Sequence, residues 1–183
     1  TQIYYLENNI EKADISTDEL VSDPQLDISL QQYQSLQEIL YKNHKYQSIE
    51  VFYNNFSPKI KIPANQNLII IESLLEQNKF NQADTIITKV GLDYALLSGS
   101  EQARYKALSS YASFHLDRKQ EALNLISEAL QVDNTASVVH YYKGRMLLET
   151  YEINEAQKYL ERAKELDLEG DITTRIEQLI NDY

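Results

Sequence analysis

The sequence predicts an all-α fold of paired antiparallel helices, and three observations predict it. The chain includes only 4 Gly and 3 Pro, so residues that interrupt helices are scarce. Apolar residues recur at every third or fourth position, which is the spacing of one helix face. The second half of the chain also repeats with an offset of 34, and a period of roughly 20 to 50 residues indicates an array of equivalent units.

The repeat is clearest between residues 103–134 and 137–168, where the offset of 34 places Ala122 on Ala156. In the first stretch, two sets of apolar residues each define a helix face on either side of a polar turn at 117–119. One set is Tyr105, Leu108, Ala112 and Leu116, and the other is Ala122, Leu123, Ile126, Ala129 and Leu130. Two amphipathic helices joined by a short polar turn predict an antiparallel helical hairpin.

This pattern resembles the tetratricopeptide repeat family, which has a small residue at repeat position 8, large residues at 11, 17 and 24, and Ala at 20 and 27. The last hairpin carries Gly144, Leu147, Ile153, Ala156, Leu160 and Ala163 at these positions, and the third carries Ser110, Ser113, Lys119, Ala122, Ile126 and Ala129. The resemblance implies a right-handed α-solenoid of about four antiparallel hairpins plus a C-terminal capping helix. Its small residues would let the two helices of each hairpin approach closely.

Extending the register toward the N-terminus places Ala83 at position 20, which is one repeat period and five further positions before Ala122. The five extra residues are assigned to 98–102, where Ser and Gly predict a loop. A further step of one period places Ile49 at position 20 of a first hairpin that lacks the usual small residues. The predicted hairpins span about 30–63, 64–97, 103–136 and 137–170.

Capping residues agree with this register. Asn81 and Asn154 share repeat position 18, and each is predicted to be the N-cap of a second helix. Gln157 follows Asn154 by three residues, as in a capping box. Asp171 is the predicted N-cap of a capping helix over 171–183, which would cover the last apolar face of the array.

Residues 1–27 do not fit the repeat and predict a leader, either partly flexible or with a short helix that Ser16 opens and Pro24 ends. The leader would pack on the first hairpin or lie across the groove of the array. Because the chain begins at Thr1 without Met, we expect an excised domain or the remainder after a signal peptide or anchor is removed. The compartment is left open between the cytoplasm and a bacterial periplasm or envelope.

Composition excludes several functions. The formal net charge is −11, without a basic stripe, which argues against nucleic acid and anionic membrane partners. The chain has no Cys and no apolar run long enough to enter a bilayer. It also lacks known catalytic and phosphate-binding motifs, so we expect no enzyme activity, no cofactor and no metal.

The resemblance implies a concave groove that binds a protein or peptide. Its candidate lining residues are Tyr41, Glu72, Arg104, Tyr111, Phe114, His115, Tyr141 and Arg145. An alternative is that Tyr111, Phe114 and Tyr141 only fill the core between hairpins, and His115 is a candidate for tuning binding with pH. Of the positions where chaperone-binding members hold a C-terminal carboxylate, only Arg104 carries a suitable side chain.

We therefore expect a protein-interaction scaffold or adaptor of the tetratricopeptide type that does not hold a terminal carboxylate. The alternative is a regulatory or oligomerising repeat domain of a larger or membrane-anchored protein. A homo-oligomer is left open as well.

Overall fold

The computed structural model describes Val21, Asp23 and residues 27–181. Regular structure in this part of the chain is helical and includes no strand, which confirms the predicted all-α class there. The predicted short helix at Ser16, and most of the leader, lie outside the described residues. The chain divides into two compact units, Thr1–Gln77 and Asn78–Tyr183, and each unit is described by itself.

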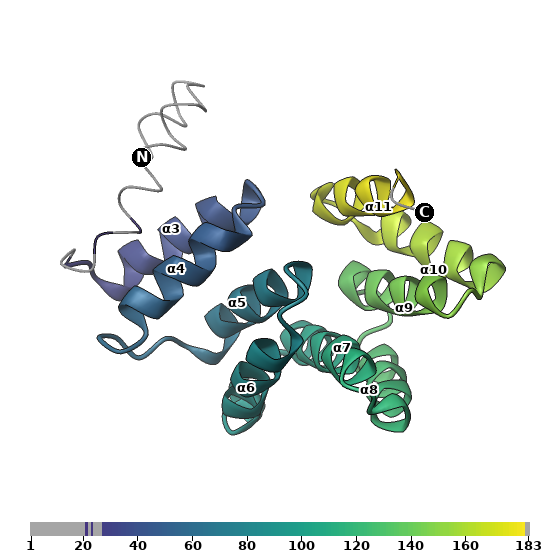
Figure 1. Ribbon diagram of the computed structural model, residues 1–183, viewed down its shortest axis with the longest axis horizontal. Coiled ribbons are helices and arrows are strands. Elements are labelled where there is room, and N and C mark those ends of the chain that lie inside the picture. Colours follow the sequence, from purple (N-terminus) through teal and green to yellow (C-terminus); the bar gives the residue numbers. More distant parts are fainter. Residues whose placement is uncertain (1–20, 22, 24–26, 182–183) are drawn as a thin grey trace. The chain divides into compact units, whose positions relative to one another are not determined.

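The first unit contains α3 (Leu30–Lys42), α4 (Tyr46–Phe56) and α5 (Ala64–Glu76) (Figure 1). The α3 helix begins at a capping box, in which the Ser29 hydroxyl accepts from the Gln32 amide at 3.3 Å. Rings hold α3 on α4, because Tyr33 stacks on Phe52 with centroids 4.6 Å apart. The Asn55 amide of α4 donates to the Val21 carbonyl at 2.7 Å, so a buried residue of the leader contacts the first hairpin.

The interface between α3 and α4 also contains polar groups without partners. Gln37 is completely buried, and among the residues that the structure describes neither its amide nitrogen nor its amide oxygen has a hydrogen-bond partner. The Tyr33 hydroxyl, one turn earlier, is buried without a partner too, and this burial, together with nearby Tyr53, raises the pKa of Tyr33 well above its ordinary value. Gln37 occupies repeat position 8, where the third and fourth hairpins have Ser and Gly.

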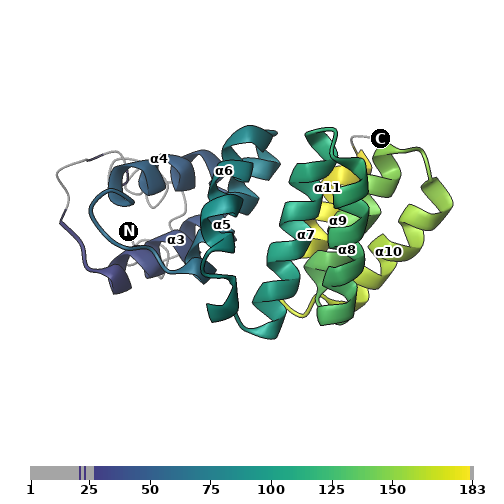
Figure 2. The same cartoon turned by 90° about the horizontal axis from the view of Figure 1, so that it is seen from below.

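The second unit contains α6 (Phe80–Gly91), a short 3₁₀ turn η1 (Tyr94–Leu96), α7 (Gly99–His115), α8 (Lys119–Val132), α9 (Ser137–Glu149), α10 (Ile153–Leu166) and α11 (Asp171–Asn181). Helices α7 and α8 pack as one hairpin and α9 and α10 as the next, while α7 also packs on α9 (Figure 2). The α11 helix contacts both α9 and α10.

Small residues at position 8 set the approach of the helices in both hairpins. A Cβ atom added to Gly144 of α9 would lie 2.7 Å from Leu160 Cδ2 and 3.3 Å from the Ala156 carbonyl oxygen, both in α10. At the equivalent place, Ser110 of α7 is buried and its hydroxyl donates to the Ala122 carbonyl of α8 at 2.7 Å. The two hairpins therefore bring their helices together at equivalent residues.

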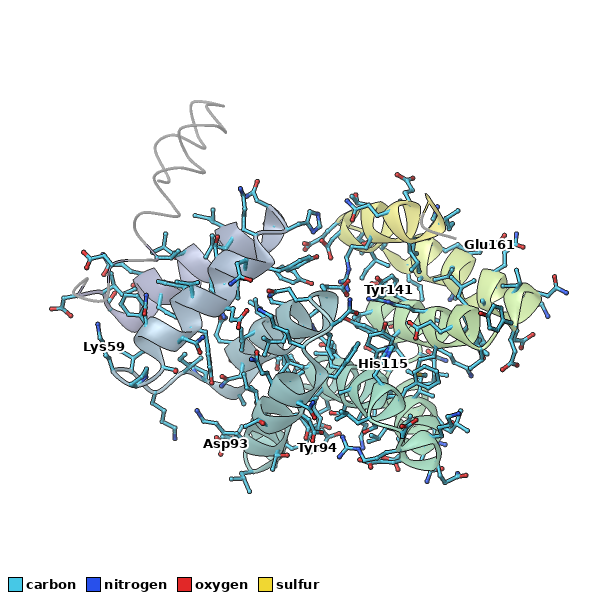
Figure 3. All side chains as sticks on the ribbon, in the orientation of Figure 1. Lys59, Asp93, Tyr94, His115, Tyr141 and Glu161 are labelled. Atoms are coloured by element: carbon cyan, nitrogen blue, oxygen red, sulfur yellow. The ribbon has the colours of Figure 1, made fainter. Side chains whose placement is uncertain are left out.

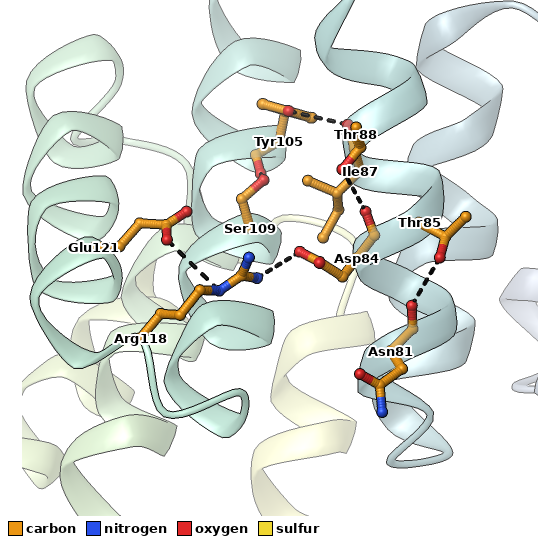
Figure 4. Close-up of polar contacts among 9 residues, drawn as sticks. All are labelled: Asn81, Asp84, Thr85, Ile87, Thr88, Tyr105, Ser109, Arg118 and Glu121. Carbon is orange, nitrogen blue, oxygen red and sulfur yellow. Dashed lines mark hydrogen bonds and ion pairs between the residues drawn. The ribbon is translucent and has the colours of Figure 1, made fainter.

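Polar contacts fasten α6 to the following hairpin (Figure 4). Arg118, in the turn between α7 and α8, donates to the Asp84 carboxylate of α6 at 2.5 Å. Its Nε atom lies 3.5 Å from Oε2 of Glu121. On α7, the Tyr105 hydroxyl donates to the Ile87 carbonyl at 3.1 Å. These bonds satisfy groups that face the neighbouring helix and fix α6 beside α7.

The turns that precede α4, α6, α8 and α10 share one backbone conformation. Their central residues have φ values of 54°, 57°, 60° and 64°, and they are His44, Asn78, Asp117 and Tyr151. Their numbers differ by 34, 39 and 34, which matches the sequence register, including the five-residue insertion. The next residue has φ between −81° and −91° and ψ of 56° or 57° in all four turns. The geometric repeat thus includes the first hairpin, where the small residues are missing.

The predicted N-caps at Asn81 and Asn154 are wrong. The α6 helix begins at Phe80 and α10 begins at Ile153, so each asparagine is the second residue of its helix. The N-cap residues are Lys79 and Glu152, and neither side chain makes a capping hydrogen bond. The left-handed turn explains the earlier helix start, because it points the backbone carbonyl of the N-cap residue along the new helix. That carbonyl accepts from the amide four residues later at 2.9–3.0 Å after all four turns.

Two further predictions are corrected at helix starts. Residues 98–102 are not a loop, because Ser98 forms a capping box with Glu101 and the residues after it are the first turn of α7. The α7 helix therefore has 17 residues, against 13 in α9. Asp171 is the first residue of α11 rather than its N-cap, since the Gly170 carbonyl accepts from the Thr174 amide at 3.1 Å.

Replacing Tyr151 by Asn is expected to stabilise the chain by about 0.5–1 kcal/mol, because Asn tolerates positive φ better than a bulky residue does. Tyr151 is 85% exposed, so little packing is lost. Urea unfolding of both proteins checks the difference. The same change at Asp117, a residue that already tolerates this conformation, should have a smaller effect, and equal effects would contradict the explanation.

Candidate functional site

Aromatic rings from α6 and α7 surround His115 at the C-terminal end of α7. Phe80 of α6 stacks on the imidazole with centroids 3.9 Å apart and planes 9° apart. Tyr111 and Phe114 approach the ring edge-on, at 4.6 Å and 5.3 Å. Figure 3 labels His115, together with Tyr141 of the neighbouring helix α9.

The Glu149 carboxylate is the charged group that joins α9 to this cluster. Its Oε1 atom accepts from the Tyr111 hydroxyl at 2.7 Å, and its Oε2 atom lies 3.1 Å from His115 Nε2. Arg145, one turn earlier on α9, places its Nε atom 3.9 Å from Oε1. The His115 and Glu149 side chains are 22% and 20% exposed, so the contact between them lies at the edge of the core.

These neighbours lower the pKa of Glu149. Burial by itself would raise the pKa of the carboxyl, but the contact with His115 and the hydrogen bond from Tyr111 favour the ionised form, and the Arg145 charge adds to them. The folded carboxyl therefore holds its proton less tightly than the unfolded one. Its contribution to stability is present above its ordinary value of 4.5 and is lost as the pH falls below it.

We expect Glu149→Gln to lower the free energy of unfolding by about 1–2 kcal/mol near neutral pH, where a charged acceptor is lost. The difference between wild type and variant should shrink as the pH falls below 4.5, and it should vanish once the wild-type carboxyl is protonated in the folded as well as the unfolded state. Urea unfolding at several pH values measures it. Glu161→Gln on the exposed face of α10 is the control, and a difference for Glu149 that stayed constant with pH would contradict the assignment.

Arginines and tyrosines alternate from α7 across α9 to α11. The Arg145 guanidinium lies 4.6 Å from the Tyr111 ring centroid and 6.0 Å from that of Tyr141. Arg175 of α11 lies 4.5 Å from the Tyr141 ring and donates to the Tyr142 hydroxyl at 3.1 Å. Because Arg175 is 4% exposed, this stack is a buried structural contact that fixes α11 beside α9.

The predicted site residues fall into three groups. Tyr111, Phe114, His115, Tyr141 and Arg145 belong to the cluster described above. Arg104 lies on the same helix, about three turns from His115. Tyr41 on α3 and Glu72 on α5 belong to the first unit, where Glu72 is completely buried.

Burial separates these candidates further. Tyr111 and Tyr141 are 1% and 2% exposed, which agrees with the alternative that they fill the core between hairpins. Phe114, His115 and Arg145 are half-buried and keep part of their surface accessible. A partner in contact with the cluster would therefore meet these three residues and Glu149.

Sequence patterns alone do not indicate several residues of this site. The stacking of Phe80 on His115 depends on the way α6 packs beside α7, which no sequence pattern specifies. Arg175 follows Tyr141 by one repeat period, so extending the repeat into α11 would have placed it in the same row. No repeat spacing links Tyr142 to Arg175, so the sequence does not indicate their hydrogen bond.

Comparison of the sequence with protein-family models gives no match, and comparison with curated proteins gives none. Among the described residues, no helix has the length and hydropathy required to cross a bilayer. In the same part of the chain, no group of three or more His, Asp or Glu side chains is arranged to hold a metal ion. The cluster on α6, α7 and α9 is thus the basis for a functional proposal.

Proposed function

We propose that this chain is a tetratricopeptide-like scaffold whose hairpins form a right-handed solenoid that binds a protein or peptide segment. The observation that carries the proposal is the recurrence of one left-handed turn at His44, Asn78, Asp117 and Tyr151. A regular spacing of turns along a chain of helical hairpins is the property of solenoid arrays, which present extended concave surfaces to partners.

The packing of the last two hairpins supports the same proposal. Gly144 and Ser110 place the paired helices in close contact at the position where the family has a small residue. The α11 helix begins one repeat period after the start of α9, and it is polar and exposed at Thr174, Glu177 and Gln178. An outer helix with a polar face is what the end of a helical array requires.

In this proposal the first helices of successive hairpins line the concave face. The accessible parts of Phe114, His115, Arg145 and Glu149 would contact the partner in the second unit. Aromatic and arginine side chains are enriched among residues that dominate binding energy. The cluster provides an apolar ring edge and a carboxylate side by side, so it would suit a segment with both apolar and positively charged residues.

The proposal is tested by affinity capture from cells of the native organism, followed by mass spectrometry. The variant Phe114→Glu places a charge on the half-buried ring position, and it should lose the partner that wild type captures. Tyr111 and Tyr141 are avoided, because a charge at such buried positions would unfold the unit.

Leu123→Glu is the matched control. Leu123 lies on α8 and is 58% exposed, so the same kind of charge is introduced outside the concave face. Far-ultraviolet circular dichroism should show unchanged helicity for both variants. If Phe114→Glu captured the same proteins in the same amounts as wild type, this face would not be the binding surface.

A further inference from the structure

His115 lies where three elements of the second unit meet. It is the last residue of α7, its ring stacks on Phe80 of α6, and its Nε2 atom lies 3.1 Å from the Glu149 carboxylate of α9. A proton gained by the imidazole would therefore add a charge at the junction of α6, α7 and α9.

We propose that His115 is a proton-operated latch that ties α6, α7 and α9 together in mild acid and so regulates the rigidity of the concave face. The inference rests on the proposed function only in identifying this face as the binding face. The latch itself is a property of the free protein, and it can be tested without a partner.

Several groups around the imidazole would stabilise a positive charge on it. The Glu149 Oε2 atom lies 3.1 Å from Nε2, and the aromatic face of Phe80 attracts a cation at the stacking distance of 3.9 Å. Because His115 is in the last turn of α7, a positive charge there also interacts favourably with the helix dipole.

Three other titratable or charged groups near the imidazole, on α7, on α9 and in the turn that leads to α8, have contacts of their own. The Tyr111 hydroxyl of α7 donates a hydrogen bond to Glu149 Oε1, and the other carboxylate oxygen, Oε2, lies beside His115. Arg145 of α9 carries a like charge, but its guanidinium lies over the Tyr111 ring. Arg118, in the turn that leads to α8, is paired with Asp84 and Glu121. Phe80, which α6 contributes, does not titrate.

The experiment is a double-mutant cycle with His115→Gln, Glu149→Gln and the double variant, unfolded by urea at about pH 5.5 and about pH 8. A cycle removes the contributions of all other titrating groups, because they are common to the four proteins. We expect the unfolding constants to show a coupling of about fivefold at the lower pH and less than about twofold at the higher pH.

A control cycle uses His140→Gln in place of His115→Gln. The Nε2 atom of His140 is hydrogen-bonded to the Asn134 carbonyl, so His140 should show no coupling to Glu149 at either pH. If a variant fails to fold, NMR of the wild type gives the answer instead, because the ring resonances of Phe80 and His115 should move together as the pH is lowered. Coupling that is equal at both pH values, or Phe80 resonances that do not respond, would overturn the proposal.

Discussion

Replacing Gly144 by Leu is expected to lower the free energy of unfolding by at least about 3 kcal/mol. Even a Cβ atom at this position would lie 2.7 Å from Leu160 Cδ2 and 2.8 Å from Leu160 Cγ. Leu160 is 5% exposed and cannot move into solvent without leaving its own packing. The backbone oxygen of Ala156, 3.3 Å away, blocks the other direction, so α9 and α10 must separate.

The matched control is the same substitution at Gly99 in the first turn of α7, where an added Cβ atom meets nothing within 4 Å. A leucine is a better helix former than glycine, so Gly99→Leu should be neutral or stabilising by up to about 1 kcal/mol. Thermal and urea unfolding measure both variants. If the two variants lost equal stability, close packing at Gly144 would not be the cause.

Replacing Gln37 by Leu is expected to raise the free energy of unfolding by about 1–3 kcal/mol, which is the usual penalty of a buried polar group without a partner. Gln37 of α3 is completely buried, and both polar atoms of its amide lack a hydrogen bond within the described part of the chain. Leucine has a similar size and leaves no polar atom behind. Tyr33→Phe removes the second unpaired group and should act in the same direction.

Gln31→Leu is the control for this prediction, because Gln31 lies on the same helix and is exposed. Its free energy of unfolding should change by no more than about 0.5 kcal/mol. Urea unfolding of the three variants provides the measurement. A loss of stability in Gln37→Leu would mean that the amide has a favourable role in the core of the first unit.

The helical class was predictable because apolar periodicity survives even where individual residues vary. In the second unit, Ala122, Ile126 and Ala129 are buried as the spacing indicates, whereas Leu123, which was predicted on the same face, is 58% exposed. The repeat period, and the five extra residues between the second and third turns, also reappear in the spacing of the turns. Periodicity and repeat length are averaged over many residues, and they are therefore robust to single substitutions.

Helix starts and side-chain partners were harder to predict. Asn81 and Asn154 are good capping residues, yet a left-handed turn starts each helix one residue before them. Tyr151 adopts positive φ although nothing in its side chain favours that conformation. The stacking of Phe80 on His115 depends on the approach of α6 and α7, which local sequence does not specify. Tertiary packing decides these features.

The short span of the contacts between helices has a consequence for the order of folding. Ser110 and Ala122 are 12 residues apart, Asp84 and Arg118 are 34 apart, and Tyr111 and Glu149 are 38 apart. Closing such small loops loses little chain entropy, and chains dominated by near-neighbour contacts fold rapidly. Each hairpin of the second unit that emerges during synthesis can therefore dock on the helices before it, without waiting for the rest of the chain.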